Sequence, residues 1–550
     1  MALITQGSFL SSCLLFFSCL LALSEASTTP KPIPYSQPFN RTSFPGGFVF
    51  GAGTAAYQSE GAALIDGRGP SVWDIFTRKH PGRHTIDEEN WIGLLQIFHF
   101  LVKNISKWKL SEGANPLGVK FYNDYINELL ANGIKPLVTL WHYDAPQALE
   151  DEYKTWLSPK ILKDYLDYVD FCFKTFGDRV KLWVTFNEPN AYSWNAYDRG
   201  TFAPGRCSSY VGKCPAGNSA TEPYIAAHHF LLSHAAAVKL YRQKYQPHQK
   251  GKIGITIPTH WFVPKFDTEA SRKAASRALD FLFGWFMDPV IFGDYPQSMR
   301  SIVGRRLPKF SEEQKKQLKG SIDFLGLNYY TGLYAESAPS SNDPNKSYSK
   351  DNQATTTTYK NGIPIGTPTA LDWLFVYPKG IGEILLHIKE KYNNPDIYIT
   401  ENGVADANNK SLPIKEALKD NLRIGYFHDH LSYVLKAIKG GVNVKGYYLW
   451  TFWDDFEWDA GFTGDEKERR KKPPTKIWGL VAMIAGDPRI GAASQNLVQR
   501  ATLPSSNEVR QWVGGFNGDL VDEDGGNKLP VGDNKCTWFG GGEAPTAATP

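Results

Sequence analysis

Two glutamates stand where strand-like runs of the sequence end. Glu188 closes the run in "KLWVTFNEPN" (181–190), and Glu401 closes the run in "IYITENG" (397–403). The β-branched and aromatic residues of both runs favour strands, and Pro189 stops the first run. On this stretch alone Glu188, which precedes Pro189, could be a solvated loop residue. If the fold brings the two glutamates together, one could exchange protons with a substrate while the other attacks it.

The ends of the other strand-like runs also carry side chains suited to binding or catalysis. These runs cover 48–58, 135–144, 252–261, 322–331 and 444–458. A single histidine or tryptophan is more often a core residue than a functional one. Such residues at the ends of successive strands are hard to explain as packing. They favour one shared site, formed by Gln58, His142, Asn187, Asn328, Tyr330, Trp450 and Glu457.

The strand-like runs alternate with helical patterns such as "VKFYNDYINELLANG" (119–133). This alternation predicts an α/β fold with a parallel sheet, and the number of units predicts a (β/α)8 TIM barrel. A doubly wound open sheet is the alternative, but no glycine-rich phosphate-binding turn follows the first run. In a barrel the carboxyl ends of the strands meet at one face, so the residues at these ends would share a site.

Composition narrows the class of protein. The chain has 550 residues, of which 42% are hydrophobic and 14% aromatic, so it can bury a large core. Its formal charge of +4 is small for this length and gives no electrostatic footprint for nucleic acid.

The N-terminus resembles a secretory signal. An apolar run from Phe9 to Leu23 is followed by small residues at Ser24 and Ala26, so residues 1–26 are predicted to be removed. A membrane anchor is the alternative, but the run is short for a span. We therefore expect a mature chain from about Ser27 that enters the secretory pathway and, once the signal is removed, is not held in a membrane.

Cysteines and glycosylation motifs agree with that compartment. Cys207 and Cys214 flank a short polar loop, and an oxidising compartment favours a disulfide between them. Cys172 lies in an apolar-periodic helix and is predicted to be a buried thiol. The Asn-x-Ser/Thr motifs predict glycosylation at Asn40, Asn104, Asn345 and Asn409.

Several motifs together resemble glycoside hydrolase family 1, in particular its secreted plant β-glucosidases and their thioglucosidase relatives. These motifs are "YQSEGA", "WHYDAPQALEDEY", "TFNEPN", "GLNYYT", "YITENG" and "WTFWDDFEW". The resemblance runs from about residue 38 to 462, so residues 27–463 are assigned to the barrel and 464–550 to an atypical, loop-rich tail. It implies that the protein is extracellular, in the cell wall, or vacuolar.

The resemblance implies roles for the two glutamates. By strand count Glu188 ends the fourth strand and Glu401 the seventh, so they would face each other across the mouth of the barrel. Two carboxyls about 5 to 5.5 Å apart define a retaining glycosidase. Glu401 is then the nucleophile and Glu188 the acid/base, and we expect the neighbouring negative charge to raise the pKa of Glu188.

The resemblance also implies a sugar pocket and a substrate class. No metal or cofactor is expected, and the binding partner is a small-molecule β-glucoside. An acid at Glu188 favours O-β-D-glucosides of phenolic or other plant aglycones, although members with both glutamates also accept thioglucosides. Tyr330 and Asn328 would orient the nucleophile, and Trp373 would contact the aglycone. The residues expected to bind the sugar are Gln58, His142, Asn187, Tyr330, Trp450, Glu457 and Trp458.

Two stretches depart from the family pattern. Residues 83–113 lack the motif resembling "YRFSISWSR" that forms the family's second barrel strand, and no arginine occurs between His84 and Arg179. The second strand would be missing or replaced by "LLQIFHFLV", and the closing helix after residue 464 would be missing as well. The alternatives to an active enzyme are therefore an inactive, sugar-binding relative and a product that does not fold stably.

Overall fold

The structure is a computed structural model that describes residues 39–59, 69–80, 114–338, 344–406, 413, 419–452 and 456–458. All of them belong to one compact unit, Met1–Thr502, and the other unit, Leu503–Pro550, lies outside the described residues. The predicted signal (1–26), the departing segment (83–113), the tail (464–550), Asn104 and Asn409 also lie outside them. No helix in the described ranges is long and apolar enough to cross a bilayer.

Seven parallel strands form the sheet that carries the site, in the spatial order β1-β12-β11-β5-β4-β3-β2. All seven strand-like runs of the sequence are thereby confirmed as strands. Their bounds are β1 (Val49–Ala52), β2 (Leu137–Thr139), β3 (Leu182–Asn187), β4 (Lys252–Pro264), β5 (Phe324–Ser337), β11 (Ile397–Glu401) and β12 (Val444–Leu449).

The strand order is that of a (β/α)8 barrel. Strands adjacent in the chain are adjacent in the sheet, and the last strand, β12, pairs with the first, β1. Among the described strands β1 and β2 are the two ends of the sheet. The expected second barrel strand would fall between them, in the part of the chain that the structure does not describe.

The interior strands are buried because both of their faces are covered. In β3 the residues from Trp183 to Asn187 are all buried, which is typical of parallel strands that pack on the barrel interior on one face and on helices on the other. This burial is why the sequence of β3 shows a continuous apolar run rather than strict alternation.

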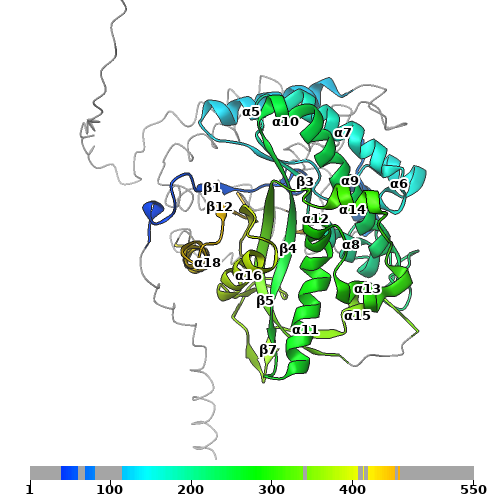
Figure 1. The fold of residues 1–550 in the computed structure, drawn as a ribbon, viewed down its shortest axis with the longest axis vertical. Coiled ribbons are helices and arrows are strands. Elements are labelled where there is room, and N and C mark those ends of the chain that lie inside the picture. The colour runs from blue at the N-terminus through cyan, green and yellow to red at the C-terminus, as the bar shows by residue number, and fades with distance from the viewer. Residues whose placement is uncertain are drawn as a thin grey trace, which may run out of the picture. The chain divides into compact units, whose positions relative to one another are not determined.

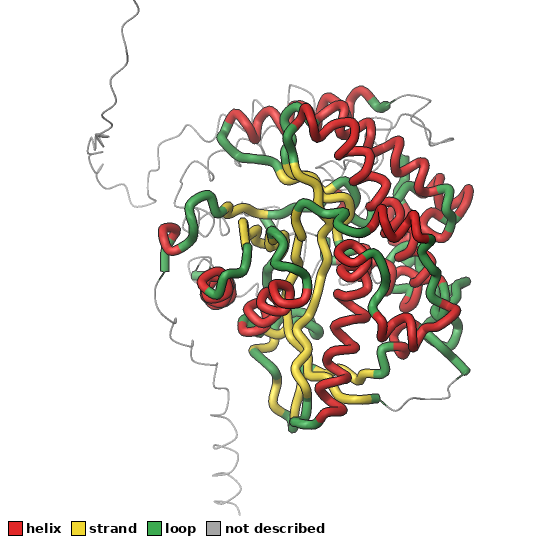
Figure 2. The backbone as a smooth tube through the Cα atoms, in the orientation of Figure 1, coloured by secondary structure: helices red, strands yellow, loops and turns green. Residues whose placement is uncertain are grey.

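Helices lie outside the strands, as Figures 1 and 2 show. In α7 the buried residues recur at helical spacing, and α7 packs against α9 while α16 packs against α18. The helices are α2 (Ala56–Ser59), α3 (Val72–Lys79), α5 (Pro116–Ala131), α6 (Gln147–Tyr153), α7 (Ile161–Phe176), α8 (Pro189–Trp194), α9 (Glu222–Leu240), α10 (Gln246–Gln249), α11 (Glu269–Leu279), α12 (Trp285–Phe292), α13 (Gln297–Val303), α14 (Glu312–Leu318), α15 (Tyr348–Asp351), α16 (Lys379–Lys391) and α18 (Asn421–Lys439).

Two strands are longer than the sequence predicted. β4 and β5 stay paired as far as Pro264 and Ala335, and β6 (Ala354–Thr357) adds to β5 in the antiparallel direction. These long strands run through the middle of Figure 1. Two short hairpins follow, formed by β7 (Tyr359–Lys360), β8 (Ile363–Pro364), β9 (Thr367–Pro368) and β10 (Phe375–Val376).

The last run is shorter than predicted, because β12 ends at Leu449 rather than near residue 458. Beyond it the backbone bonds to loops instead of strands. The N–H of Trp450 donates to the carbonyl of Asn402, and the N–H of Phe452 donates to that of Gly53. Trp450, Glu457 and Trp458 therefore stand on a loop above the strand.

The cysteine predictions are confirmed. Cys207 and Cys214 form a disulfide, with Cα atoms 5.4 Å apart. Cys172 is a buried free thiol on α7, and burial raises its pKa to about 12. Asn40 and Asn345 are exposed, so both are accessible, although their glycosylation stays a prediction.

Candidate active site

Glu188 stands at the junction between β3 and α8. Its backbone is left-handed, with φ 48° and ψ 46°, and its N–H donates to the carbonyl of Thr256 at 3.0 Å. Both carboxyl oxygens accept hydrogen bonds. The amide of Asn328 donates to Oε1 at 2.9 Å, and the hydroxyl of Tyr143 donates to Oε2 at 2.7 Å.

Glu401 is the last residue of β11 and lies beside Asn328 of β5 in the sheet. Its side chain is buried, and its Oε2 accepts a hydrogen bond from the hydroxyl of Tyr330 at 2.6 Å. Within the described residues no salt bridge joins Glu401 or Glu188 to a lysine, arginine or histidine. In the described part of the chain, hydrogen-bond donors are the groups that contact these two carboxyls.

Asn328 joins the two halves of the site. Its Oδ1 accepts from the hydroxyl of Thr400 at 2.7 Å, and its amide reaches Asn187 at 3.1 Å as well as Glu188. That Asn328 orients the nucleophile stays a prediction. Its hydrogen bond at 2.9 Å goes to Glu188, and its hydrogen bonding also lowers the pKa of Glu401.

Burial raises the pKa of both carboxyls. For Glu188 burial is the main cause, and the donors Asn328 and Tyr143 oppose it. For Glu401 burial acts first and the charge of Glu188 second, so its pKa lies well above the ordinary value. The expected rise for Glu188 is confirmed in direction, but its cause is burial rather than the neighbouring charge. Two buried carboxyls at one site do not readily ionise together.

His142 and Asn187 lie side by side at the ends of β2 and β3. The amide nitrogen of Asn187 donates to Nε2 of His142 at 3.1 Å, which makes Nε2 the acceptor and leaves the ring proton on Nδ1. Burial lowers the pKa of His142 to about 3, so the ring is neutral at physiological pH. A neutral ring and an amide offer polar contacts without adding charge.

Trp450 provides a flat wall at one side of the site. Its ring stacks on that of His142, with centroids 5.8 Å apart. Two glycines, Gly53 after β1 and Gly403 after β11, let the backbone approach Trp450 closely. A Cβ at Gly53 would meet the Trp450 ring at 2.9 Å, and a Cβ at Gly403 would meet the Trp450 carbonyl at 1.9 Å. The close contact explains why both positions hold glycine.

Gln58 of α2 contacts the segment after β12 that carries Glu457 and Trp458. The amide of Gln58 donates to the carbonyl of Phe456 at 3.0 Å, next to Glu457. The charge of Glu457 raises the pKa of Glu401, which shows that the two lie in the same electrostatic environment. Trp458 is buried in an aromatic cluster, and its ring lies 4.8 Å from that of Trp73.

Trp373 lies at the outer rim. Its side chain is 43% exposed, and its ring is 5.9 Å from that of Tyr330, edge to face. Alternation along β5 explains this arrangement, because neighbouring residues face opposite ways. Tyr330 bonds to Glu401, whereas Tyr329 donates to the carbonyl of Tyr377 and Thr331 to that of Phe375.

Sequence reasoning missed two residues of this network, Tyr143 and Thr400. Each is next to a selected residue, His142 and Glu401 respectively, so position at a strand end was a usable signal. Their hydrogen bonds join different strands, however, and no spacing rule predicts such contacts.

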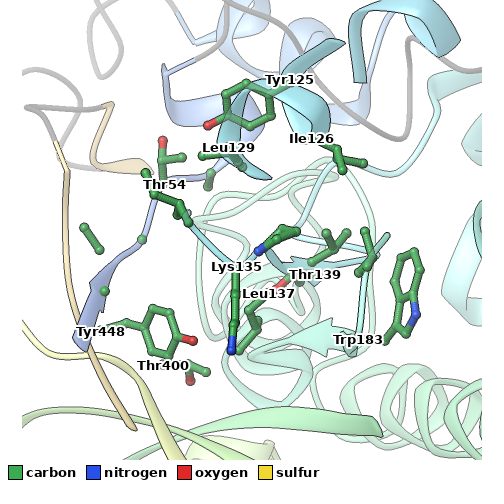
Figure 3. A pocket seen from close by; sticks show the side chains of 18 of the residues that line it. Thr54, Tyr125, Ile126, Leu129, Lys135, Leu137, Thr139, Trp183, Thr400 and Tyr448 are labelled. Carbon is green, nitrogen blue, oxygen red and sulfur yellow. The ribbon is translucent and has the colours of Figure 1, made fainter. Parts of the chain in front are cut away.

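A cavity of about 1010 Å³ adjoins the site. Figure 3 shows side chains around it that come from β2 and its flank (Lys135, Leu137 and Thr139) and from β12 and β11 (Tyr448 and Thr400). Its lining also includes Glu401, Asn187, His142 and Trp450. The cavity thus extends from the catalytic face along the two end strands of the described sheet. No group of three or more metal-binding side chains is present in the described ranges.

Comparison with known proteins gives consistent matches. The model of glycosyl hydrolase family 1 matches residues 40–99 and 110–465. The chain is 49% identical over 479 residues to β-glucosidase 12 of Oryza sativa subsp. indica, covering 83% of this chain and 93% of the relative. It is 49% identical over 471 residues to β-glucosidase 17 of Arabidopsis thaliana, and the match covers 82% of this chain and 91% of that relative.

Solved structures agree. A rice β-glucosidase mutant in a covalent complex with Glc is 40% identical, with a TM-score of 0.75, and the match covers 81% of this chain and 99% of that one. An aphid myrosinase is 30% identical with a TM-score of 0.67, covering 81% and 100%. The family match omits only residues 100–109 between its two parts, so the interruption is narrower than the motifs in 83–113 indicated.

Proposed function

The chain belongs to glycosyl hydrolase family 1, and we propose that Glu188 and Glu401 are the carboxyls with which it hydrolyses β-glucosides. The protein is a retaining β-glucosidase. One observation carries the assignment of the site. Asn328 donates to Glu188, which follows β3, and is paired in the sheet with Glu401 at the end of β11, and a tyrosine hydroxyl donates to each carboxyl. The sugar-binding alternative gains no support from the relatives.

The reaction has two steps. In the first, Glu401 attacks the anomeric carbon while Glu188 gives its proton to the glycosidic oxygen, and the aglycone leaves. In the second, water attacks the glucosyl ester and Glu188 takes the proton from that water. Burial raises the pKa of Glu188, which favours the protonated acid that the first step needs.

The remaining residues bind and orient. Neutral His142, Asn187, Gln58 and Glu457 hydrogen-bond the glucose hydroxyls, and Trp450 lies against the apolar face of the ring. Tyr330 holds Glu401 in position for attack. The Tyr330 hydroxyl donates to Oε2 of Glu401 at 2.6 Å, which supports this role.

The preferred substrates are O-β-D-glucosides of phenolic or other plant aglycones. A carboxylic acid at Glu188 can protonate an alkoxide or phenolate leaving group, which such glucosides need. Exposed Trp373, beside Tyr330, supplies an aromatic surface for the aglycone. The protein acts in the secretory pathway, at the cell wall or in the vacuole, and the disulfide supports an oxidising compartment.

Trapping the intermediate tests the assignment. A 2-deoxy-2-fluoroglucoside with a good leaving group should inactivate the enzyme and leave the fluorosugar on Glu401, identified by peptide mass mapping. Proton NMR of early hydrolysis should show β-glucose first. Label on another residue, or α-glucose as the first product, would overturn the assignment.

A further inference from the structure

Tyr143 is a buried residue whose hydroxyl reaches the acid/base. It follows β2 in the chain, is 2% exposed, and donates to Oε2 of Glu188 at 2.7 Å. The roles assigned above give it no function.

The backbone at Tyr143 is in the left-handed region, with φ 73°, which bulky residues rarely adopt. Its neighbours hold it there. The N–H of His142 donates to Oδ1 of Asp144 at 3.2 Å, and the carbonyl of Trp141 accepts from Asn187 at 2.9 Å. Strain of this kind concentrates at functional sites.

Aromatic rings fix the Tyr143 side chain from several sides. Ring centroids lie at 4.7 Å for Trp458, 5.3 Å for Tyr192, 5.6 Å for Phe202 and 5.8 Å for Trp141. The packing leaves the phenol few positions, so its hydroxyl is held ready at Glu188.

The two donors to Glu188 differ in what they can do. The amide nitrogen of Asn328 only donates, and it bonds to Oε1. The hydroxyl of Tyr143 both donates and accepts, so it can bond to Oε2 whether or not that oxygen carries a proton. Tyr143 can therefore keep its hydrogen bond to Oε2 when that oxygen gains or loses a proton, while Asn328 remains a donor to Oε1.

We propose that Tyr143 is a positioning residue for the second step, in which its hydroxyl stabilises the ionised Glu188 that acts as the base. The inference rests on the proposed function. In this step the water oxygen bonds to the anomeric carbon, the bond to Glu401 breaks, and a water proton passes to Glu188.

In the second step the titration of Glu188 is no longer coupled to that of Glu401. In the glucosyl enzyme Glu401 is an uncharged ester, and His142 is neutral because burial keeps its pKa at about 3. Burial also raises the pKa values of Tyr143 and Tyr330 well above their usual range, so both phenols stay neutral. The groups that surround Glu188 come from the loop after β2, from β5, from β11 and from the loop after β12: His142, Tyr143, Tyr330, Glu401 and Glu457.

The experiment is the pH dependence of kcat on 2,4-dinitrophenyl β-glucoside, whose departure is fast enough for the second step to limit turnover. The acidic limb then reports the ionisation of Glu188. Tyr143→Phe removes a donor to the charged form and should move this limb to higher pH by about one unit. Replacing Tyr143 with 3,5-difluorotyrosine strengthens the donor at nearly the same size and should move the limb to lower pH.

Tyr192→Phe is the matched control. It removes a buried hydroxyl from the ring beside Tyr143, one that interacts with Tyr197 rather than Glu188, and should leave the limb in place. If the fluorinated enzyme and Tyr143→Phe both keep the limb of the active parent, the inference is wrong while the proposed function stands. If the parent forms no glucosyl enzyme, the proposed function fails and the inference with it. If Tyr143→Phe does not fold, the position of the acidic limb in the enzyme with 3,5-difluorotyrosine alone tests the inference.

Discussion

At the level of single residues, the carboxyls of Glu188 and Glu401 differ in the groups that donate hydrogen bonds to them. Glu188 accepts from Asn328 and Tyr143, whereas Glu401 accepts from Tyr330 at its Oε2. Glu401 is buried and Glu188 is partly buried, so each depends on these few donors when it is ionised. Changes to either carboxyl should therefore have distinct kinetic signatures.

Glu401→Gln removes the attacking carboxylate and should abolish turnover on every β-glucoside. Glu188→Gln removes only the proton donor, so kcat/KM should fall by roughly 10² to 10⁴ on glucosides with poor leaving groups and far less on dinitrophenyl glucoside. Comparing kcat/KM on the two substrates measures the difference. Equal losses on both would contradict this division of roles.

The raised pKa of Glu401 predicts a shifted pH profile. The nucleophile must be ionised, and burial raises its pKa above the ordinary 4.5 even while Glu188 is protonated. Activity is therefore lost as pH falls through that raised value, and the acidic limb of kcat/KM should lie well above pH 4.5. A limb at or below pH 4.5 would mean that a cation outside the described residues offsets the charge.

Elements were predicted from the sequence more fully than contacts. The seven strands were found because each is an apolar run of strand-forming residues that a barrel buries on both faces. The extension of β4 and β5 was missed because its stability comes from mutual pairing as far as Pro264 and Ala335. The bond from Tyr143 to Glu188 was missed because it depends on one left-handed backbone angle.

The disulfide should stabilise the loop that it closes. Cys207 and Cys214 are 7 positions apart, and in the chain-entropy account a loop this short contributes about 2 kcal/mol. The double substitution Cys207→Ser and Cys214→Ser should lower the free energy of unfolding by that amount, measured by denaturant titration. Reducing the parent should give the same loss. An unchanged midpoint in both would show that the surrounding packing alone maintains the loop.

At the scale of the molecule, the cavity lies beside β1 and β2, the two end strands of the described sheet. Barrel interiors are normally filled by side chains, whereas here about 1010 Å³ adjoins β1 and β2 and reaches Glu401. A segment resembling "YRFSISWSR" would supply both a barrel strand and an arginine at this position. Residues 84–113 contain no arginine and lack this motif.

Grafting such a segment between Gly82 and Asn115 should therefore raise kcat/KM by roughly tenfold, because an adjacent cation lowers the pKa of Glu401 by about one unit. The acidic limb should move to lower pH and the active range should widen. The control graft carries Leu in place of the arginine and should not shift the limb. A parent enzyme with a broad profile and unchanged rate after grafting would contradict our view that the departure impairs catalysis.

The anchoring of the Trp373 segment has a consequence for redesign. β9 and β10 pair with each other, and Thr331 and Tyr329 of β5 tie Phe375 and Tyr377 to the barrel, while the indole between them stays 43% exposed. The exposed residues around Trp373 can thus be substituted while the strands on either side stay anchored to β5. A library randomised over the exposed residues 370, 372 and 373, with buried Leu371 unchanged, should yield variants with new aglycone preferences and an intact sugar pocket, so leaving-group selectivity and glucose recognition can be evolved separately.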